Sequence, residues 1–246
     1  MQVYISDILL ISGLKSRESY VRIDFAGCDF KCGYCDRQEI LDFKVGFQRD
    51  IKEVKEKIKE YVGVAGAIIF SGAEPCLQRQ ALQNLAKYCK GLGFKIILKT
   101  NGTSPSLLGL LVKGGLVDKV RIEFKAPLID GIFERVTKSR TFFKSSDEVI
   151  DSFEKSLEII KKNDNKIGVV FRTVIVPGLL YKKEDILWVA KRISAVNCVW
   201  VLQQFNNEGI DGMFGKIDSP SISFLENLKE ICMKEYSNLR IHIIGC

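Results

Sequence analysis

The feature that most constrains the fold is an alternation of short apolar runs with longer amphipathic stretches along the chain. The apolar runs are rich in β-branched and aromatic residues, which favours strands, and they occupy residues 20–27, 66–72, 94–100, 117–125, 167–176, 199–205 and 240–245. Helix candidates lie between them, at 49–61, 77–90, 104–113, 146–162, 183–195 and 220–236. Because alternating strands and helices form a parallel sheet with helices outside it, the sequence predicts an α/β fold, either a parallel barrel or a doubly wound sheet. Of the two we expect the barrel, a partial (β/α)6 TIM-like barrel. A hairpin-like segment over 2–12 precedes the alternation.

Length and composition predict a single domain. With 246 residues, of which 46% are hydrophobic, the chain is long enough for one large domain of the barrel type or for two small domains. It contains no Pro/Gly-rich linker, no low-complexity tract and no repeat of fixed period. We therefore expect one domain over 1–246, with a core at about 20–206 and a C-terminal helix–strand extension over 207–246.

Charge and hydropathy argue against several classes of protein. No apolar run approaches the roughly 20 residues that a membrane-spanning helix needs. The net charge of +7 comes from Lys and Arg interleaved with acidic residues, which is typical of solvated helix faces rather than of a nucleic-acid groove. The eight cysteines are few for a secreted disulfide scaffold, and the start does not have the pattern of a signal peptide. We expect a cytoplasmic protein with no nucleic-acid or membrane partner.

Three cysteines, Cys28, Cys32 and Cys35, lie within the stretch "GCDFKCGYC", directly after the first strand of the alternation. A disulfide uses two thiols and a closed tetrahedral zinc site uses four ligands, so three thiols raise the question of a missing ligand. A zinc site that includes one of the five other cysteines, or three unrelated thiols, are the alternatives.

Polar stretches follow the later strands as well, namely "SGAEP", "KTNGT", "EFKAP", "RTVIVPG" and "LQQFN". In a parallel barrel or doubly wound sheet, the carboxyl ends of the strands and the loops that follow them carry the chemistry. The polar clusters and the three cysteines are therefore expected at the same end of the sheet, where they indicate a functional site.

The stretch "CDFKCGYC" resembles the Cys-x3-Cys-x2-Cys signature of the radical S-adenosylmethionine (SAM) superfamily, and "SGAEP" is similar to its Gly-Gly-Glu-Pro motif, with Ala73 in place of the second Gly. The similarity extends from about residue 20 to residue 206. Within the superfamily, "KTNGT", "FKAP", "RTVIVPGLL" and "VLQQF" most resemble the activating enzymes of glycyl radical enzymes, of the anaerobic ribonucleotide reductase and pyruvate formate-lyase types.

The resemblance implies that Cys28, Cys32 and Cys35 hold three irons of a 4Fe-4S cluster, and that the fourth iron takes the amino and carboxylate groups of SAM. It also implies reductive cleavage of SAM to a 5'-deoxyadenosyl radical, with no catalytic residue beyond the cluster and SAM ligands. For an activating enzyme, the hydrogen donor is a backbone glycine of a partner glycyl radical enzyme. The electron would come from a reduced donor such as flavodoxin or ferredoxin.

The resemblance also implies which residues contact SAM. Tyr34 would lie against the adenine, while Gly72, Ala73 and Glu74 would approach the methionyl amino group. Thr100 and Asn101 would end the third strand close to the ligand, and Arg172 and Gln204 would contact its carboxylate or ribose. Loop packing for Tyr34, and strand-end capping for the last four residues, are the structural alternatives.

The motif that reads Asp-x-Lys in pyruvate formate-lyase activators is Glu123 and Lys125 here, and Lys99 replaces a second aspartate. In the activators the two aspartates face a monovalent cation beside SAM. We hypothesise that the Lys99 ammonium occupies the place of that cation and pairs with Glu123. The alternative is that Lys99 points outward. After the third cysteine stands "DRQE", so that Arg37 occupies the position where 7-carboxy-7-deazaguanine synthases have a Thr.

The segment 127–146 is long for a strand-to-helix connection, so it either has a function or carries a short helix. It combines Phe133, Phe142 and Phe143 with four basic residues, Arg135, Lys138, Arg140 and Lys144. We predict that it meets the glycyl radical enzyme, and a covering loop that packs on the barrel is the alternative. For the whole chain, the alternatives to an activating enzyme are a radical SAM enzyme acting on a small molecule, similar to 7-carboxy-7-deazaguanine synthase, and a non-catalytic iron–sulfur or zinc protein.

Overall fold

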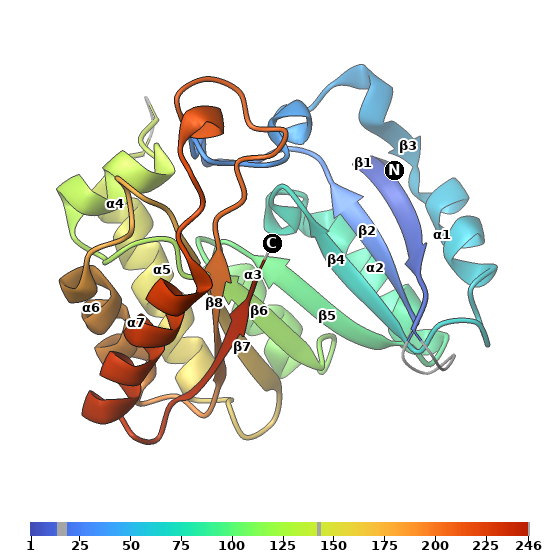
Figure 1. Ribbon diagram of the computed structural model, residues 1–246. Helices are drawn as coiled ribbons and strands as arrows, with labels where there is room; N and C mark the ends of the chain where they lie inside the picture. The colour runs from blue at the N-terminus through green and yellow to red at the C-terminus, as the bar shows by residue number, and fades with distance from the viewer. Residues whose placement is uncertain (14–18, 142–143, 246) are drawn as a thin grey trace. The chain divides into compact units, whose positions relative to one another are not determined.

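The computed structural model describes residues 1–13, 19–141 and 144–245 (Figure 1). The chain divides into two compact units that alternate along the sequence. The first unit consists of residues 1–29, 37–100 and 104–121, and the second of residues 30–36, 101–103 and 122–246. The single domain that we expected therefore stays a prediction, and each unit is described by itself.

The first unit contains strands β1 (Gln2–Ile11), β2 (Tyr20–Phe25), β3 (Gln48–Asp50), β4 (Ala67–Gly72) and β5 (Lys95–Thr100), hydrogen-bonded in the order β3-β1-β2-β4-β5 (Figure 1). Strands β2, β4 and β5 are parallel, whereas β1 is antiparallel to β2 and to β3. The segment 2–12, expected to be hairpin-like, therefore contains one ten-residue strand. Its partners are β2, the next strand along the chain, where Ile11 pairs with Tyr20, and the more distant β3, where Gln2 pairs with Asp50.

The helices of the first unit are α1 (Ile51–Lys59), α2 (Arg79–Gly91) and α3 (Pro105–Lys113), with short 3-10 helices η2 (Gln38–Ile40), η3 (Val45–Phe47) and η4 (Pro75–Leu77). Side chains alternate between the two faces of a strand, and one face of β2, β4 and β5 is apolar and buried, with Val21, Ile23, Phe25, Ile68, Phe70, Ile96 and Leu98. The other face carries the polar residues Arg22, Asp24, Ser71 and Lys99. The parallel strands of this unit thus have one packed face and one face available for chemistry.

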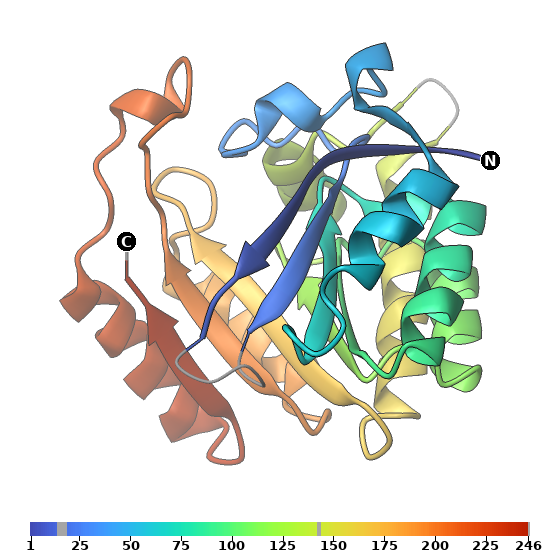
Figure 2. The same cartoon turned by 90° about the vertical axis from the view of Figure 1, so that its right-hand side faces the viewer.

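The second unit contains α4 (Asp130–Thr137), α5 (Ser146–Lys161), β7 (Gly168–Ile175), α6 (Lys183–Ile193), β8 (Val199–Gln204), the 3-10 helix η5 (Phe214–Lys216), α7 (Ile222–Glu235) and β9 (Arg240–Ile244). Strand β6 (Lys119–Glu123) begins in the first unit and ends in the second. Strands β7, β8 and β9 are parallel, and Figure 2 shows β9 with α7 in red beside β8 in orange. Here too one face is apolar, because Phe171, Ile175, Trp200 and Leu202 are fully buried.

The predicted α/β architecture is confirmed. Helices α1, α2, α3, α5, α6 and α7 follow strands β2, β4, β5, β6, β7 and β8 in turn, as a (β/α)6 fold requires. The long connection after β6 carries a short helix, α4, as one of our two expectations for it stated. No helix of the described ranges is long and apolar enough to cross a membrane.

Candidate functional site

The cysteine loop, residues 26–36, leaves the carboxyl end of β2. Its first part belongs to the first unit and is held by backbone hydrogen bonds: the Gly27 N–H donates to the Ile40 carbonyl at 2.8 Å, and the Cys28 N–H donates to the Leu41 carbonyl at 2.9 Å. Gly27 has φ +91°, a left-handed conformation that glycine adopts at little cost. Cys28 is half-buried, and its own N–H and that of Gly27 are both held by these hydrogen bonds.

The second part of the loop belongs to the second unit and rests on the end of α4. The carbonyl of Thr137, the last residue of that helix, accepts the Lys31 N–H at 3.0 Å and the Cys32 Sγ–H at 3.6 Å. The Cys35 N–H then donates to the Cys32 carbonyl at 3.1 Å, which forms a turn in the chain. Helix ends leave carbonyl groups without intrahelical partners, and here one of them positions the middle cysteine.

The other cysteines lie in packed surroundings. Cys76, Cys89, Cys198 and Cys232 are buried, and burial raises the pKa of Cys89 to about 12 and that of Cys198 and Cys232 to about 11. Burial, together with the charge of Glu74, also raises the pKa of Cys76. Such thiols are unreactive and behave as small apolar side chains.

None of the seven described cysteines forms a disulfide. Within the described parts of each unit, no three His, Cys, Asp or Glu side chains are grouped as a metal site. The loop itself is divided, with Cys28 in the first unit and Cys32 and Cys35 in the second. The assignment of these three cysteines as metal ligands therefore rests on their chemistry and their sequence motif.

The "SGAEP" stretch of the first unit is anchored to the beginning of the cysteine loop. Gly72 has φ +92°, the Ala73 N–H donates to the Phe25 carbonyl at 2.8 Å, and the Glu74 N–H donates to the Gly27 carbonyl at 2.9 Å. The Glu74 carboxylate is fully buried, and its Oε1 accepts from the Thr100 hydroxyl at 2.8 Å and from the backbone N–H of residue 76 at 3.0 Å. The Glu74 side chain thus ties the end of β4 to β5.

In the second unit, Arg172 lies at the centre of the predicted polar residues. Its Nε donates to Glu123 Oε2 at 2.6 Å, and its Nη1 donates to Gln203 Oε1 at 2.7 Å. The Lys125 ammonium lies over the ring of Tyr34, 5.5 Å from its centre. The structure therefore brings Tyr34, Glu123, Lys125 and Arg172 into one group, although they come from different segments of the sequence.

The electrostatics of this group keep its two cations charged. Burial alone would lower the pKa of Lys125, but the neighbouring Tyr34, Cys32 and Glu123 raise it. For Arg172, burial is likewise outweighed by the charge and hydrogen bond of Glu123, so that its pKa is raised. Burial raises the pKa of Tyr34, which keeps the phenol protonated. The group carries two cations and one carboxylate, an excess of positive charge suited to an anionic ligand.

Gln203 was missed by the sequence reasoning, which selected Gln204. The register pairs Val174 of β7 with Gln203 of β8, which places Gln203 on the same face as Arg172. Gln204 lies on the opposite face, and its amide donates to the Pro220 carbonyl at 2.7 Å. The signal that could have found Gln203 is the period of two in "VWVLQQ", where Trp200, Leu202 and Gln204 share the face opposite to that of Gln203.

Asn101, a further predicted residue, has a local partner in Thr103. Asn101 Oδ1 accepts from the backbone N–H of Thr103 at 3.1 Å and from its hydroxyl at 2.8 Å. Lys99 is half-buried on the polar face of the first unit, whereas Glu123, its hypothetical partner, pairs with Arg172 in the second. The Lys99–Glu123 pair stays a prediction, and so does contact of any of these residues with SAM.

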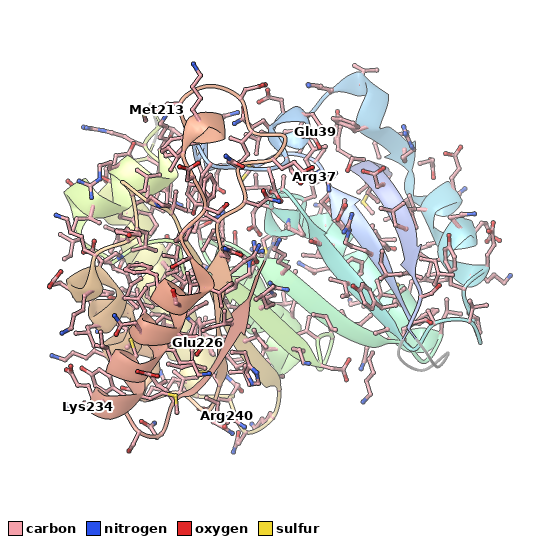
Figure 3. All side chains as sticks on the ribbon, viewed as in Figure 1. Arg37, Glu39, Met213, Glu226, Lys234 and Arg240 are labelled. Carbon is pink, nitrogen blue, oxygen red and sulfur yellow. The ribbon has the colours of Figure 1, made fainter. Side chains whose placement is uncertain are left out.

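Arg37, which follows the third cysteine by two positions, belongs to a network that anchors the end of the loop to the first unit. Its guanidinium contacts Asp24 Oδ2 at 3.0 Å, Asp7 Oδ2 at 3.1 Å and Glu39 Oε1 at 2.6 Å. Arg37 and Glu39 are labelled in Figure 3. The Asp24 side chain is 1% exposed and also pairs with Arg22 at 3.0 Å. A guanidinium with several fixed donors suits such a network, so Arg37 holds the chain that leaves the cysteine loop against β1 and β2.

The segment 127–146 has a different role at Phe133 from the one we predicted. Phe133 is 1% exposed and packs edge-on against Phe30 of the cysteine loop, with ring centres 5.9 Å apart. It therefore supports the loop and offers no anchor to a partner. Phe142 and Phe143 lie outside the described residues.

The donor set of the cysteine loop fits an iron–sulfur cluster. Thiolates are the soft, anionic ligands that hold such clusters. The positively charged Lys125 interacts electrostatically with Cys32 of this loop. Close packing also shapes the loop, because the ring of Phe214 lies 2.7 Å from the position that a Cβ on Gly33 would take.

Comparisons with known proteins indicate the family of this chain. The family model described as the radical SAM superfamily matches residues 23–188. A relative from Methanocaldococcus jannaschii, provisionally named a glycyl-radical enzyme activating enzyme, is 30% identical and covers 100% of this chain and 98% of its own length. A 7-carboxy-7-deazaguanine synthase from Hyperthermus butylicus is 31% identical over 35% of this chain and 36% of its own length.

Among solved structures, a radical SAM methyltransferase from Sphaerobacter thermophilus has a TM-score of 0.72 at 13% identity and covers 97% of this chain and 69% of its own length. At that identity the likeness concerns the fold. The family model spans most of the chain, and the M. jannaschii relative aligns with all of it. The chain belongs to the radical SAM superfamily.

Proposed function

We propose that this radical SAM enzyme activates a glycyl radical enzyme, such as an anaerobic ribonucleotide reductase. The observation that carries the proposal is the match of the whole chain to the M. jannaschii protein named as an activating enzyme. Membership of the superfamily implies a 4Fe-4S cluster and SAM, and together these supply, after one-electron reduction, a 5'-deoxyadenosyl radical that takes a hydrogen atom from the target glycine. Cys28, Cys32 and Cys35 are the proposed cluster ligands.

The protein's own residues would bind and orient SAM. The Arg172 guanidinium is fixed by Glu123 at Nε and by Gln203 at Nη1. Its Nη2 has no hydrogen-bond partner among the described residues, so this group can receive a carboxylate. Lys125 adds a second positive charge beside Tyr34. We propose that this cationic group binds the methionyl carboxylate of SAM.

The test is an anaerobic incubation of the reconstituted, reduced protein with SAM and a glycyl radical enzyme encoded in the same genome. We expect methionine and 5'-deoxyadenosine to form, and the partner to acquire a glycyl doublet in electron paramagnetic resonance. A variant of the partner with Ala at the target glycine serves as the control and should show no doublet.

A second candidate function is a radical SAM reaction on a small molecule, which the partial match to a 7-carboxy-7-deazaguanine synthase favours. That match covers about a third of either chain, so it gives less support than the full-length one. The two candidates differ in the incubation described above. If no partner acquires a radical, yet a small molecule accelerates 5'-deoxyadenosine release, the activating role is wrong and the small-molecule reaction replaces it.

The contact between Gln203 and Arg172 leads to a prediction for SAM affinity. In Gln203→Leu, Nη1 loses its acceptor and the guanidinium loses its orientation. A hydrogen bond to a charged group contributes about 1.5 to 3 kcal/mol, so the Kd for SAM should rise about 10-fold or more. Equilibrium dialysis with SAM, and with decarboxylated SAM as the ligand without a carboxylate, measures the effect.

Gln204→Leu is the matched control, because Gln204 points to the opposite face and bonds to Pro220. We expect this variant to change the Kd for SAM less than Gln203→Leu does. Gln203→Leu should also leave the Kd for decarboxylated SAM nearly unchanged. An equal loss of affinity for both ligands in Gln203→Leu would show that Gln203 acts on the fold rather than on the carboxylate site.

A further inference from the structure

The second unit has an exposed group of cations around the cysteine loop, which we call the α4 basic surface: Lys31, Arg135, Lys138 and Arg140. The last three have no ion pair with any residue that the structure describes. The two acidic residues of this segment are already engaged. Asp130 accepts from the Ser146 hydroxyl, and Glu134 Oε2 accepts from the backbone N–H groups of residues 139 and 140, at 3.1 and 2.9 Å. Both carboxylates keep their charges, but the four exposed cations outnumber them, so the surface has a net positive charge.

This surface is built on the same element that holds the middle cysteine. Thr137 is fully buried, and its carbonyl accepts from the Lys31 N–H and from Cys32 Sγ. Lys138 follows it directly, with φ 46°, and caps the helix. The packing of Phe133 against Phe30 connects helix and loop a second time. Anything that binds these cations therefore lies next to the backbone that carries Cys32.

The character of the surface indicates the kind of partner. Its exposed side chains are charged, apart from Ile129, which is 47% exposed, and Phe133 is withdrawn into the core. Tight protein interfaces rely on central aromatic or Arg anchors in dry pockets. Charged contacts instead raise association rates, and short-lived redox complexes have small interfaces. A positively charged surface with no aromatic anchor among its described residues thus suits a transient, acidic partner more than a stable one.

We propose that the α4 basic surface is the docking site for an acidic one-electron donor protein. In this reaction one electron leaves the donor and reduces the cluster bound at Cys32, so the donor is oxidised by one electron and no atom is transferred. The inference rests on the proposed function, because it needs the cluster in the cysteine loop. It adds to that function the surface through which the electron reaches the protein. Asp36, an exposed acid in the same loop, would repel such a donor and so would direct it toward α4.

The test is stopped-flow reduction of the reconstituted cluster by flavodoxin hydroquinone, an acidic donor, followed by cluster absorbance under anaerobic conditions. The variant carries Arg135→Glu, Lys138→Glu and Arg140→Glu. We expect its second-order rate constant to fall about 10-fold or more at low ionic strength, because electrostatic steering contributes 10-fold to 1000-fold to such rates. Variant and wild type should converge in high salt, where screening removes the steering.

A matched control reverses three exposed lysines at the turn between α5 and β7, with Lys161→Glu, Lys162→Glu and Lys166→Glu. Its net charge changes equally, but these residues precede the amino end of β7, whereas Tyr34 of the cysteine loop contacts Lys125, which follows the carboxyl end of β6. We expect less than a 2-fold change. A second surface variant, with Gln at 135, 138 and 140, guards against loss of α4 stability and should show an intermediate decrease. Photoreduced 5-deazaflavin, which is small and lacks acidic groups, should reduce all variants equally.

The possible outcomes separate this inference from the proposed function. Iron and sulfide analysis comes first, because a protein without a cluster contradicts the proposed function itself. If the cluster is present and the charge-reversed variant accepts electrons from flavodoxin at the wild-type rate, the donor site lies elsewhere and only this inference is wrong. If that variant is reduced normally but forms less glycyl radical with the small reductant, the surface belongs to the glycyl radical enzyme, which also overturns it.

Discussion

Changing Cys28, Cys32 or Cys35 to Ala is expected to abolish cluster binding and, with it, SAM cleavage. A cluster held by three thiolates loses a ligand that no neighbouring side chain can replace, because the other described cysteines are buried in packed positions. The wild-type protein, reconstituted anaerobically, should contain about four irons and four sulfides per chain. Iron and sulfide analysis, the visible spectrum and 5'-deoxyadenosine release measure the loss.

Cys89→Ala and Cys198→Ala are the matched controls, since both thiols are buried and far from reactive pKa values. Each should keep the full iron content and lose only the stability that a small buried side chain contributes. Two results would contradict the assignment. One is stoichiometric zinc without sulfide in the wild type, and the other is a normal iron and sulfide content in any of the three loop variants.

Much of the fold could be predicted because its signals are local. The strands at 66–72, 94–100 and 199–205 are short apolar runs, and each appears within one or two residues of the predicted place as β4, β5 and β8. Helix α5 begins at Ser146, as predicted, with a capping box between Ser145 and Glu148. Segment 2–12 was harder, because the partners of β1 lie in β2 and β3 and nothing within the segment specifies them.

The site could be predicted where a motif is compact in sequence, as in the cysteine loop and "SGAEP". It could not be predicted where contacts depend on register or on distant segments. The carbonyl of Thr137 meets Cys32 across more than a hundred residues, and the partner of Arg172 on β8 depends on the pairing of two strands. The burial of Phe133 could not be predicted for the same reason, because the ring that covers it, Phe30, lies in a distant segment of the sequence.

Gly72→Ala is expected to lower the free energy of unfolding by about 2 to 5 kcal/mol. Gly72 has φ +92°, and an L-residue in the left-handed region costs about 1 to 2 kcal/mol. In addition, a Cβ at this position would stand 2.5 Å from the Phe25 carbonyl oxygen and 2.6 Å from its nitrogen. These are backbone atoms of the neighbouring strand, so they cannot move aside as a flexible side chain would, and overpacking adds about 1 to 3 kcal/mol. For a chain of this size the melting temperature should fall by about 4 to 20 °C.

Gly93→Ala separates the two contributions, because Gly93 has φ +87° but a Cβ at this position would meet no atom within 4 Å apart from its chain neighbours. This control should lose only the cost of the left-handed conformation, about 1 to 2 kcal/mol. The difference between the two variants, measured by urea unfolding of the unreconstituted protein, then reports the clash with Phe25. Equal losses would mean that β4 can move away from Phe25 at Gly72 without a further loss of stability. A larger loss for Gly72→Ala would mean that the close approach of β4 to β2, which allows the Ala73 N–H to reach the Phe25 carbonyl at 2.8 Å, requires a glycine at this position.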